Sequence, residues 1–301
     1  MKLLINIGGT KTEALYWNGG PVDAPEVAAT ADFEDVDALI SRFLSKDHTT
    51  DALLLAVAGP VSQGRARLTN GRLHFDEPTL KERFNLPACI VANDAVAGAW
   101  SLYNPAGAQQ GSHLFACVGT GLGGALLTQG MQSVVTPLEP GRLGPGLIAE
   151  TFGDVLSPDD LARKTELEHA LSGTGLGRVA DEVAAHLGAT ARYGSGKAVF
   201  EAAQNGDATA LEITSRFWKL LASFCAEMTL FFPDLKSIQL SGSVVLHNLD
   251  ALENGPFSET YATRLAPFGD YKPLPIEPFT ANLAELRGLA NLARVMGLAS
   301  G

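Results

Sequence analysis

Cysteine is scarce in this sequence, and no pattern of cysteines suits a disulfide or a bound metal. Three cysteines, Cys89, Cys117 and Cys225, occur among 301 residues. They lie far apart, and none forms a pair with the spacing of metal ligands. We therefore expect buried free thiols, without a disulfide or a structural zinc site.

Long apolar runs are also missing. No uninterrupted run reaches the roughly 18 apolar residues that a membrane-spanning helix needs. The apolar segment after Met1 and Lys2 is broken by glycine too early for a signal peptide. We therefore expect a cytoplasmic protein without a membrane partner. With 46% hydrophobic residues, the chain has ordinary globular composition, and its length suffices for two domains.

Positive charge is in deficit. The chain has 22 Lys and Arg residues against 33 Asp and Glu residues, which gives a formal net charge of −11 and a pI of about 5.0. Such a surface repels phosphate backbones and argues against nucleic acid as a partner. It does not exclude a small anionic ligand that backbone N–H groups bind locally.

Apolar strand-like runs alternate with helical patterns in the first hundred residues. This alternation predicts an α/β sheet with helices on both faces. The expected strands are 2–7, 12–17, 51–59 and 88–94, and the expected helices are 36–44, 78–84 and 95–103.

Residues 113–130 repeat the plan of residues 3–20, which is strand, glycine turn, strand. Two copies of one layout predict two similar domains. The middle of the chain is mostly helical, with a long helix from Ala208 to Phe232, and residues 282–297 form a closing amphipathic helix. We expect a small α/β domain of residues 1–104 plus 283–301 and a large one of residues 105–282.

The two glycine turns are the first candidate site. They are Gly8-Gly9-Thr10, followed by Lys11, and the segment 119–124. Glycine lets the backbone approach an anion closely, and successive N–H groups then form an anion-binding concavity. Each turn could instead simply close a hairpin. Two matching turns favour the anion, and the strand that follows each turn disfavours a dinucleotide-binding loop, which a helix should follow.

Asn93 and Asp94 stand where an expected strand ends and a helix begins. Either residue can cap the helix. Alternatively, Asp94 lies at the carboxyl end of a sheet strand, where it could accept a proton from a substrate hydroxyl. The pair alone favours the cap.

Seven segments together resemble the bacterial glucokinase family, which belongs to the superfamily of hexokinase, actin and Hsp70 ATPases. In chain order they are INIGGTKTEAL (5–15), VAGPVSQGRARLTNGRLHF (57–75), VANDAVAGA (91–99), VGTGLGGALL (118–127), ELEHALSGTGLGRV (166–179), IQLSGSVV (238–245) and ELRGLANLARVMG (285–297). The resemblance implies a two-domain actin-like (ribonuclease H-like) ATPase fold with a central cleft. It also implies ATP-dependent phosphorylation of a hexose, most simply glucose, at its 6-hydroxyl.

The resemblance further implies roles for single residues. Asp94 corresponds to the catalytic base. Four residues correspond to contacts of the sugar: Asn93, Asn70, Glu168 and, by a shifted register, Glu139. The residues expected to bind ATP are Gly8, Gly9, Thr10, Lys11, Gly119, Thr120, Gly121, Gly123, Gly242 and Ser243. Mg²⁺ would bridge the ATP phosphates.

The sequence departs from this family in three places. Asn6 stands where the family has an aspartate that orients hydrated Mg²⁺, so metal affinity and turnover should fall. The segment 136–150 lacks the family's Glu-Gly-Gly-His, whose place Arg142 could occupy, and such a change can alter substrate choice. GGTKTEAL is similar to the related repressor–kinase branch, but that branch's zinc motif is absent.

These departures leave two alternatives to a glucose kinase. One is a kinase for a different sugar or sugar derivative. The other is a catalytically weak sugar or nucleotide sensor. The family also implies a possible homodimer.

Overall fold

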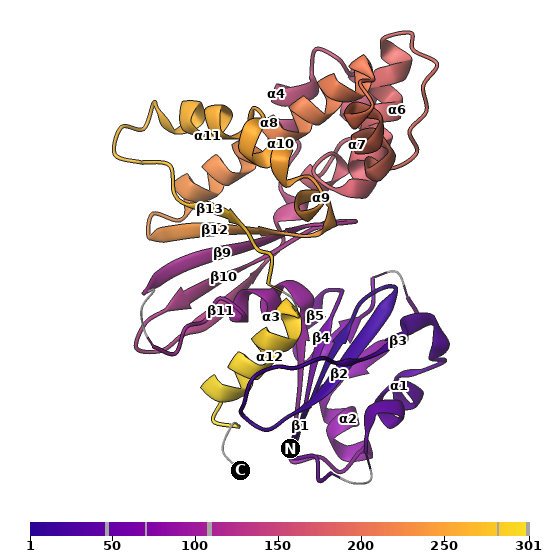
Figure 1. Cartoon of the computed structure of the whole chain (residues 1–301), viewed down its shortest axis with the longest axis vertical. Helices are drawn as coiled ribbons and strands as arrows, with labels where there is room; N and C mark the ends of the chain where they lie inside the picture. The colour runs from indigo at the N-terminus through magenta and orange to yellow at the C-terminus, as the bar shows by residue number, and fades with distance from the viewer. Residues whose placement is uncertain (46–47, 70, 107–109, 282, 299–301) are drawn as a thin grey trace. The chain divides into compact units, whose positions relative to one another are not determined.

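The computed structural model describes residues 1–45, 48–69, 71–106, 110–281 and 283–298. Strands and helices are mixed along these residues, so the predicted α/β class is confirmed (Figure 1). Two compact units divide the chain. One contains Met1–Gln110, Ala125–Pro137 and Ala281–Gly301, and the other contains Gly111–Gly124 and Leu138–Thr280. The domain boundaries expected from the sequence stay a prediction.

The first unit is built on a five-stranded sheet with the order β3-β2-β1-β4-β8. β1 and β2 form an antiparallel hairpin, and β4 and β8 continue the sheet in parallel with β1. The strands are β1 (Lys2–Ile7), β2 (Lys11–Trp17), β3 (Glu26–Ala29), β4 (Ala52–Val57) and β8 (Ala88–Asn93).

Helices cover both faces of this sheet, as predicted (Figure 1). Successive strand residues point to opposite faces. Leu3 and Leu53 therefore join the core cluster of α1 (Val36–Phe43) and α2 (Glu77–Arg83), whereas Leu4 joins that of the other two helices. Those two are α3 (Asp94–Trp100) and α12 (Ala284–Val295).

The helices α3 and α12 cross at very short range. A Cβ atom built on Gly288 would lie 1.6 Å from the carbonyl oxygen of Ala97. Further along the same pair, Asn291 Nδ2 donates to the carbonyl oxygen of Trp100 at 2.9 Å. Only glycine permits this approach at position 288, and the successive contacts show that the two helices run in the same direction.

A small three-stranded sheet was not expected from the sequence. It consists of β5 (Val61–Ser62), β6 (Arg65–Arg67) and β7 (His74–Asp76). Residues 65–70, which cover β6, do alternate in the sequence, but strands of two or three residues are too short for such a pattern to predict a sheet.

The second sheet has the order β11-β10-β9-β12-β13, which repeats the plan of the first. In each sheet the first strand of the hairpin, β1 or β9, also pairs in parallel with a later strand, β4 or β12. The predicted repeat of the layout is therefore confirmed. Its strands are β9 (Gly111–Val118), β10 (Leu122–Gln129), β11 (Val134–Leu138), β12 (Leu235–Ser241) and β13 (Ile276–Pro278).

Helices dominate the rest of the second unit, as predicted. They are α4 (Gly146–Phe152), α5 (Pro158–Ala162), α6 (Gly173–His186), α7 (Gly196–Gln204), α8 (Ala208–Phe231), α9 (Ser243–Leu246), α10 (Leu249–Asn254) and α11 (Phe257–Leu265), with short 3-10 turns at Thr30–Asp32 (η1), Pro140–Arg142 (η2) and Leu167–His169 (η3). Within the described residues, no helix is both long and apolar enough to cross a bilayer.

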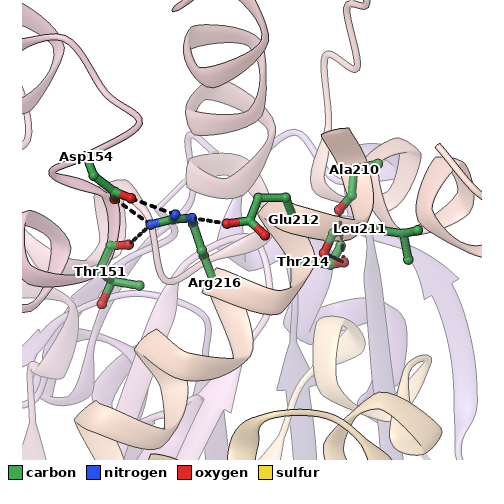
Figure 2. Close-up of polar contacts among 7 residues, drawn as sticks. All are labelled: Thr151, Asp154, Ala210, Leu211, Glu212, Thr214 and Arg216. Atoms are coloured by element: carbon green, nitrogen blue, oxygen red, sulfur yellow. Dashed lines mark hydrogen bonds and ion pairs between the residues drawn. The ribbon is translucent and has the colours of Figure 1, made fainter. Parts of the chain in front are cut away.

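Arg216 fixes the long helix α8 to the last turn of α4 and to the residues just after it (Figure 2). Its guanidinium group binds both carboxylate oxygens of Asp154, at 2.6 and 2.9 Å, and donates to the carbonyl oxygen of Thr151 at 2.6 Å. Glu212, one turn earlier on α8, accepts a further bond at 2.7 Å. This bidentate pair specifies which side of α8 faces α4.

None of the three cysteines forms a disulfide within the described residues. The expectation of burial is correct for Cys225 and wrong for Cys89 and Cys117, which are partly exposed. Cys89 lies on β8, the edge strand of the first sheet, and Cys117 lies near the end of β9, so neighbouring strands and helices cover them less completely.

Candidate functional site

The carboxyl ends of three parallel strands meet at one edge of the first sheet. Ile7 pairs with Val57, and Val57 pairs with Asn93, so β1, β4 and β8 end level with one another. The first glycine turn follows β1 at this edge, and Asp94 follows β8. One strand lies between them, which separates their starting points by roughly 10 Å. Open α/β sheets bind their ligands at such an edge.

The first glycine turn is held by hydrogen bonds from Thr30 and is otherwise exposed to solvent. Thr30, which the sequence did not single out, donates from its hydroxyl to the carbonyl oxygen of Gly8 and from its N–H to that of Thr10. Gly9, Thr10 and Lys11 are exposed. A Cβ built on Gly9 meets nothing within 4 Å. The fold itself therefore does not require glycine at position 9. A ligand that approaches the backbone closely would require it, because a side chain there would be in the way.

A buried carboxylate that the sequence missed lies under this turn. Glu13 is 8% exposed and pairs across the hairpin with Asn6. Asn6 Nδ2 donates to Glu13 Oε2 at 3.2 Å, and Lys11 Nζ lies 2.7 Å from Glu13 Oε1. The negative charge that residue 6 lacks is therefore present on the neighbouring strand. Only the register of β1 and β2 could have pointed to Glu13.

Asn93 and Asp94 both take part in the start of α3. Asn93 Oδ1 accepts from the N–H groups of Ala95 and Val96, and Asn93 Nδ2 donates to the carbonyl oxygen of Gly59. Asp94 Oδ1 also accepts from Ala95 N–H, at 2.9 Å. Because Asn93 already caps the helix, the fold has less need of a carboxylate at position 94.

Asn70, the other predicted sugar contact near this edge, lies outside the described residues.

Glu285, in the first turn of α12, is a second acidic group that the sequence did not reveal. Burial raises the pKa of its carboxyl group, and the nearby charges of Asp94 and Glu13 raise it further, whereas Lys11 lowers it. The close parallel crossing of α12 and α3 places the first turns of both helices together. Asp94 therefore has an acidic neighbour that is far from it in the sequence.

The second unit gathers the other predicted phosphate-binding turn and the segment around Gly242. Gly119 N–H donates to the carbonyl oxygen of Gly121 at 2.9 Å, Thr120 between them is exposed, and a Cβ on Gly119 meets nothing within 4 Å. Gly242 has φ of +94°, and a Cβ there would lie 2.3 Å from the carbonyl oxygen of Val118. Gly242 and Ser243 therefore lie directly beside this turn.

Glu168 lies against the same turn. Its Oε2 accepts from Leu122 N–H at 2.8 Å. A Cβ on Gly121 would lie 2.6 Å from Oε2, and one on Gly141 would lie 3.0 Å from it. The glycines at these two positions make room for the carboxylate.

Glu139 is exposed, and its backbone begins the short turn that contains Gly141. Arg142, which could fill the space of the missing histidine, forms an ion pair with Glu166 that raises the pKa of its guanidinium group. Gly123 lies in β10, one residue after Leu122.

Each unit thus collects part of the predicted site. The first unit brings Asn6, Gly8, Gly9, Thr10, Lys11, Asn93 and Asp94 to one sheet edge. The second unit collects Gly119, Thr120, Gly121, Gly123, Glu139, Glu168, Gly242 and Ser243. The roles of these residues stay predictions. Within the described residues, no three His, Cys, Asp or Glu side chains form a group that could hold a metal ion.

A family model described as glucokinase matches residues 3–296. The glucokinase of Pseudomonas aeruginosa (strain LESB58) is 28% identical over 313 residues, which cover 95% of this chain and 92% of that protein. The N-acetylmannosamine kinase of Yersinia pseudotuberculosis is 30% identical over 258 residues, which cover 81% of this chain and 83% of that protein.

Among solved structures, a ROK family glucokinase from Streptomyces griseus, in complex with glucose and AMPPNP, superposes with a TM-score of 0.66. It is 23% identical, and the match covers 97% of this chain and 99% of that one. Such likenesses confirm the predicted two-domain actin-like ATPase fold. The chain therefore belongs to the glucokinase family, as its seven segments predicted.

Proposed function

We propose that this protein transfers the γ-phosphoryl group of ATP to the 6-hydroxyl group of a hexose, with glucose as the acceptor. The observation that supports this most directly is the sheet edge shared by the first glycine turn and Asp94. Phosphoryl transfer to an alcohol needs an anion-binding backbone and an acidic side chain held at a fixed separation. A rigid parallel sheet supplies that separation.

In this proposal the two glycine turns hold the ATP phosphates through their backbone N–H groups. Gly9 and Gly119 support it, because neither position is crowded in the structure and both would let phosphate oxygens reach the main chain. Lys11 adds positive charge, and Thr10 and Thr120 add hydroxyl donors. The nucleoside lies against Gly242 and Ser243, and Gly123 continues the second turn.

The acceptor hydroxyl would be activated by Asp94, which takes its proton as the phosphoryl group arrives. Asn93, Asn70, Glu168 and Glu139 would hold the remaining hydroxyls. Because the side-chain oxygen of Asn93 is used by the helix cap, its contribution to the sugar comes from the amide N–H that Gly59 does not use.

Mg²⁺ would enter with ATP, since the described residues offer no carboxylate cluster able to hold a metal alone. The ion would neutralise the phosphate charge. The protein groups that would lie next to the ion are the hydrogen-bonded side chains of Asn6 and Glu13.

The variant Asp94→Ala tests the base. We expect phosphorylation in an ADP-release assay to fall by about 100-fold or more, while glucose binding, measured by calorimetry, persists. The fold should survive because Asn93 Oδ1 still accepts from Ala95 N–H. The matched control is Asp23→Ala, at an exposed aspartate near Met1 and Leu3, which lie at the opposite end of β1 from the glycine turn. Equal turnover in Asp94→Ala and the parent protein would rule out this assignment.

One observation favours a second acceptor. The Yersinia relative is named for N-acetylmannosamine, and the segment 136–150 here differs from the Glu-Gly-Gly-His pattern of glucokinases. A sugar panel that contains glucose, mannose and N-acetylmannosamine decides between the two. Binding of sugar and nucleotide without turnover would instead support a sensor. The homodimer stays a prediction.

A further inference from the structure

We propose that Glu168 is a positioning residue that couples the acceptor site to the second phosphate-binding turn. The proposal rests on the function proposed above, in which Glu168 binds a sugar hydroxyl and the 119–122 turn binds phosphate. It adds that binding of one substrate strengthens binding of the other through this single side chain.

The turn is held at both ends by one short segment, residues 168–173. At the start of the turn, Gly173 N–H donates to the carbonyl oxygen of Gly119 at 2.7 Å. At its end, Leu122 N–H donates to Glu168 Oε2 at 2.8 Å. The N–H groups between these two anchors are the ones expected to face phosphate.

The segment 168–173 is itself rigidly built. Ser172 caps α6 by accepting from Gly175 N–H, and its hydroxyl donates to the carbonyl oxygen of Glu168 at 2.9 Å. The backbone of Glu168 is thus fixed to the helix, whereas the one hydrogen bond of its carboxylate to the described part of the chain is that from Leu122 N–H. The position of the carboxylate and the conformation of the turn must therefore change together.

The two carboxylate oxygens of Glu168 have different surroundings. Oε2 is enclosed by Leu122 N–H, Gly121 and Gly141. Oε1 makes no hydrogen bond to the described part of the chain. A sugar hydroxyl that donates to Oε1 would restrict the rotation of the carboxylate and so hold Oε2 on Leu122 N–H.

Ordering of the turn by the sugar lowers the entropy that ATP must lose on binding. Linkage makes the effect reciprocal, so ATP strengthens sugar binding by the same factor. Couplings of this kind typically change affinity by about 5-fold to 150-fold.

The test measures the Kd of AMPPNP by calorimetry, without glucose and with saturating glucose. In the parent protein we expect glucose to lower this Kd by about 5-fold or more. In Glu168→Ala we expect weaker AMPPNP binding even without sugar, because Leu122 N–H has lost its acceptor, and no further response to glucose. A residue that only touched the sugar would leave AMPPNP binding without glucose unchanged.

Two further variants separate this role from a general loss of structure. Glu168→Gln keeps a carbonyl oxygen for Leu122 N–H and should restore AMPPNP affinity in the absence of sugar. Glu166→Gln, two residues away in the sequence and paired with Arg142, should keep the full response to glucose.

The possible failures are distinguishable. If the parent protein binds both ligands but glucose leaves the AMPPNP Kd unchanged, the coupling is wrong and the proposed function stands. If Glu168→Ala binds AMPPNP as tightly as the parent protein, the role of Glu168 is wrong. If the parent protein binds neither ligand, the proposed function fails and the coupling fails with it.

Discussion

The pair formed by Asn6 and Glu13 makes a sharp prediction about an aspartate at position 6. In the variant Asn6→Asp, a carboxylate oxygen would replace an amide nitrogen that lies 3.2 Å from Glu13 Oε2. At an effective dielectric constant of about 20, two unit charges at that separation repel by about 5 kcal/mol. Each charge is spread over two oxygens, and Lys11 lies beside them, so the net repulsion is smaller.

The variant also loses a hydrogen bond to a charged group, which is worth about 1.5–3 kcal/mol. We therefore expect Asn6→Asp to lower the free energy of unfolding by about 3 kcal/mol at pH 7.5. The repulsion is relieved when one carboxyl group binds a proton, so the loss should be smaller at pH 5. Urea unfolding at both pH values measures it.

The matched control exchanges the two groups. In the double variant Asn6→Asp with Glu13→Gln, the new amide on β2 can donate to the new carboxylate on β1, which restores the hydrogen bond with its direction reversed. We expect most of the lost stability to return, and a double-mutant cycle that includes Glu13→Gln gives the coupling energy. If Asn6→Asp is as stable as the parent protein, or if the two substitutions are simply additive, the reasoning is refuted.

Three further predictions concern stability. Burial raises the pKa of Glu285, so the ionised form of its carboxyl group is disfavoured in the folded state. Glu285→Gln should therefore raise the Tm at pH 8 but not at pH 4. A lower Tm at pH 8 would contradict this. Hydrogen bonds from Thr79 and Arg65 lower the pKa of Asp76 to about 2. The ionised carboxylate of Asp76 therefore stabilises the folded state above pH 4, and this stabilisation is lost toward pH 2. The Tm deficit of Asp76→Ala should therefore disappear on acidification, and a constant deficit would count against it. Gly288→Ala should destabilise the protein by about 3 kcal/mol in urea, because its Cβ would overlap Ala97; Gly9→Ala, with open space at its Cβ, is the control that should unfold like the parent protein.

Local patterns were sufficient for much of the fold. Continuous apolar runs located β1, β4 and β8, and the helical period located α8 almost to the residue. Most strands shorter than four residues were missed, because so few residues carry little periodic signal. The burial of Cys89 was overestimated because a strand's apolar character does not reveal whether the strand lies at a sheet edge, and that of Cys117 because this residue lies near the end of a central strand.

Consecutive residues were enough to identify the two glycine turns, the acidic residue after a sheet strand and the family, because each of these features is a local pattern in the sequence. Which distant groups meet could be seen only in the folded chain. Glu13 lies beneath the first turn through strand register, and Glu285 lies near Asp94 through a helix crossing that Gly288 permits. Glu168 reaches Leu122 across 46 residues of chain. Such contacts depend on how elements pack, and packing is a property of the whole fold, which no short stretch of sequence contains.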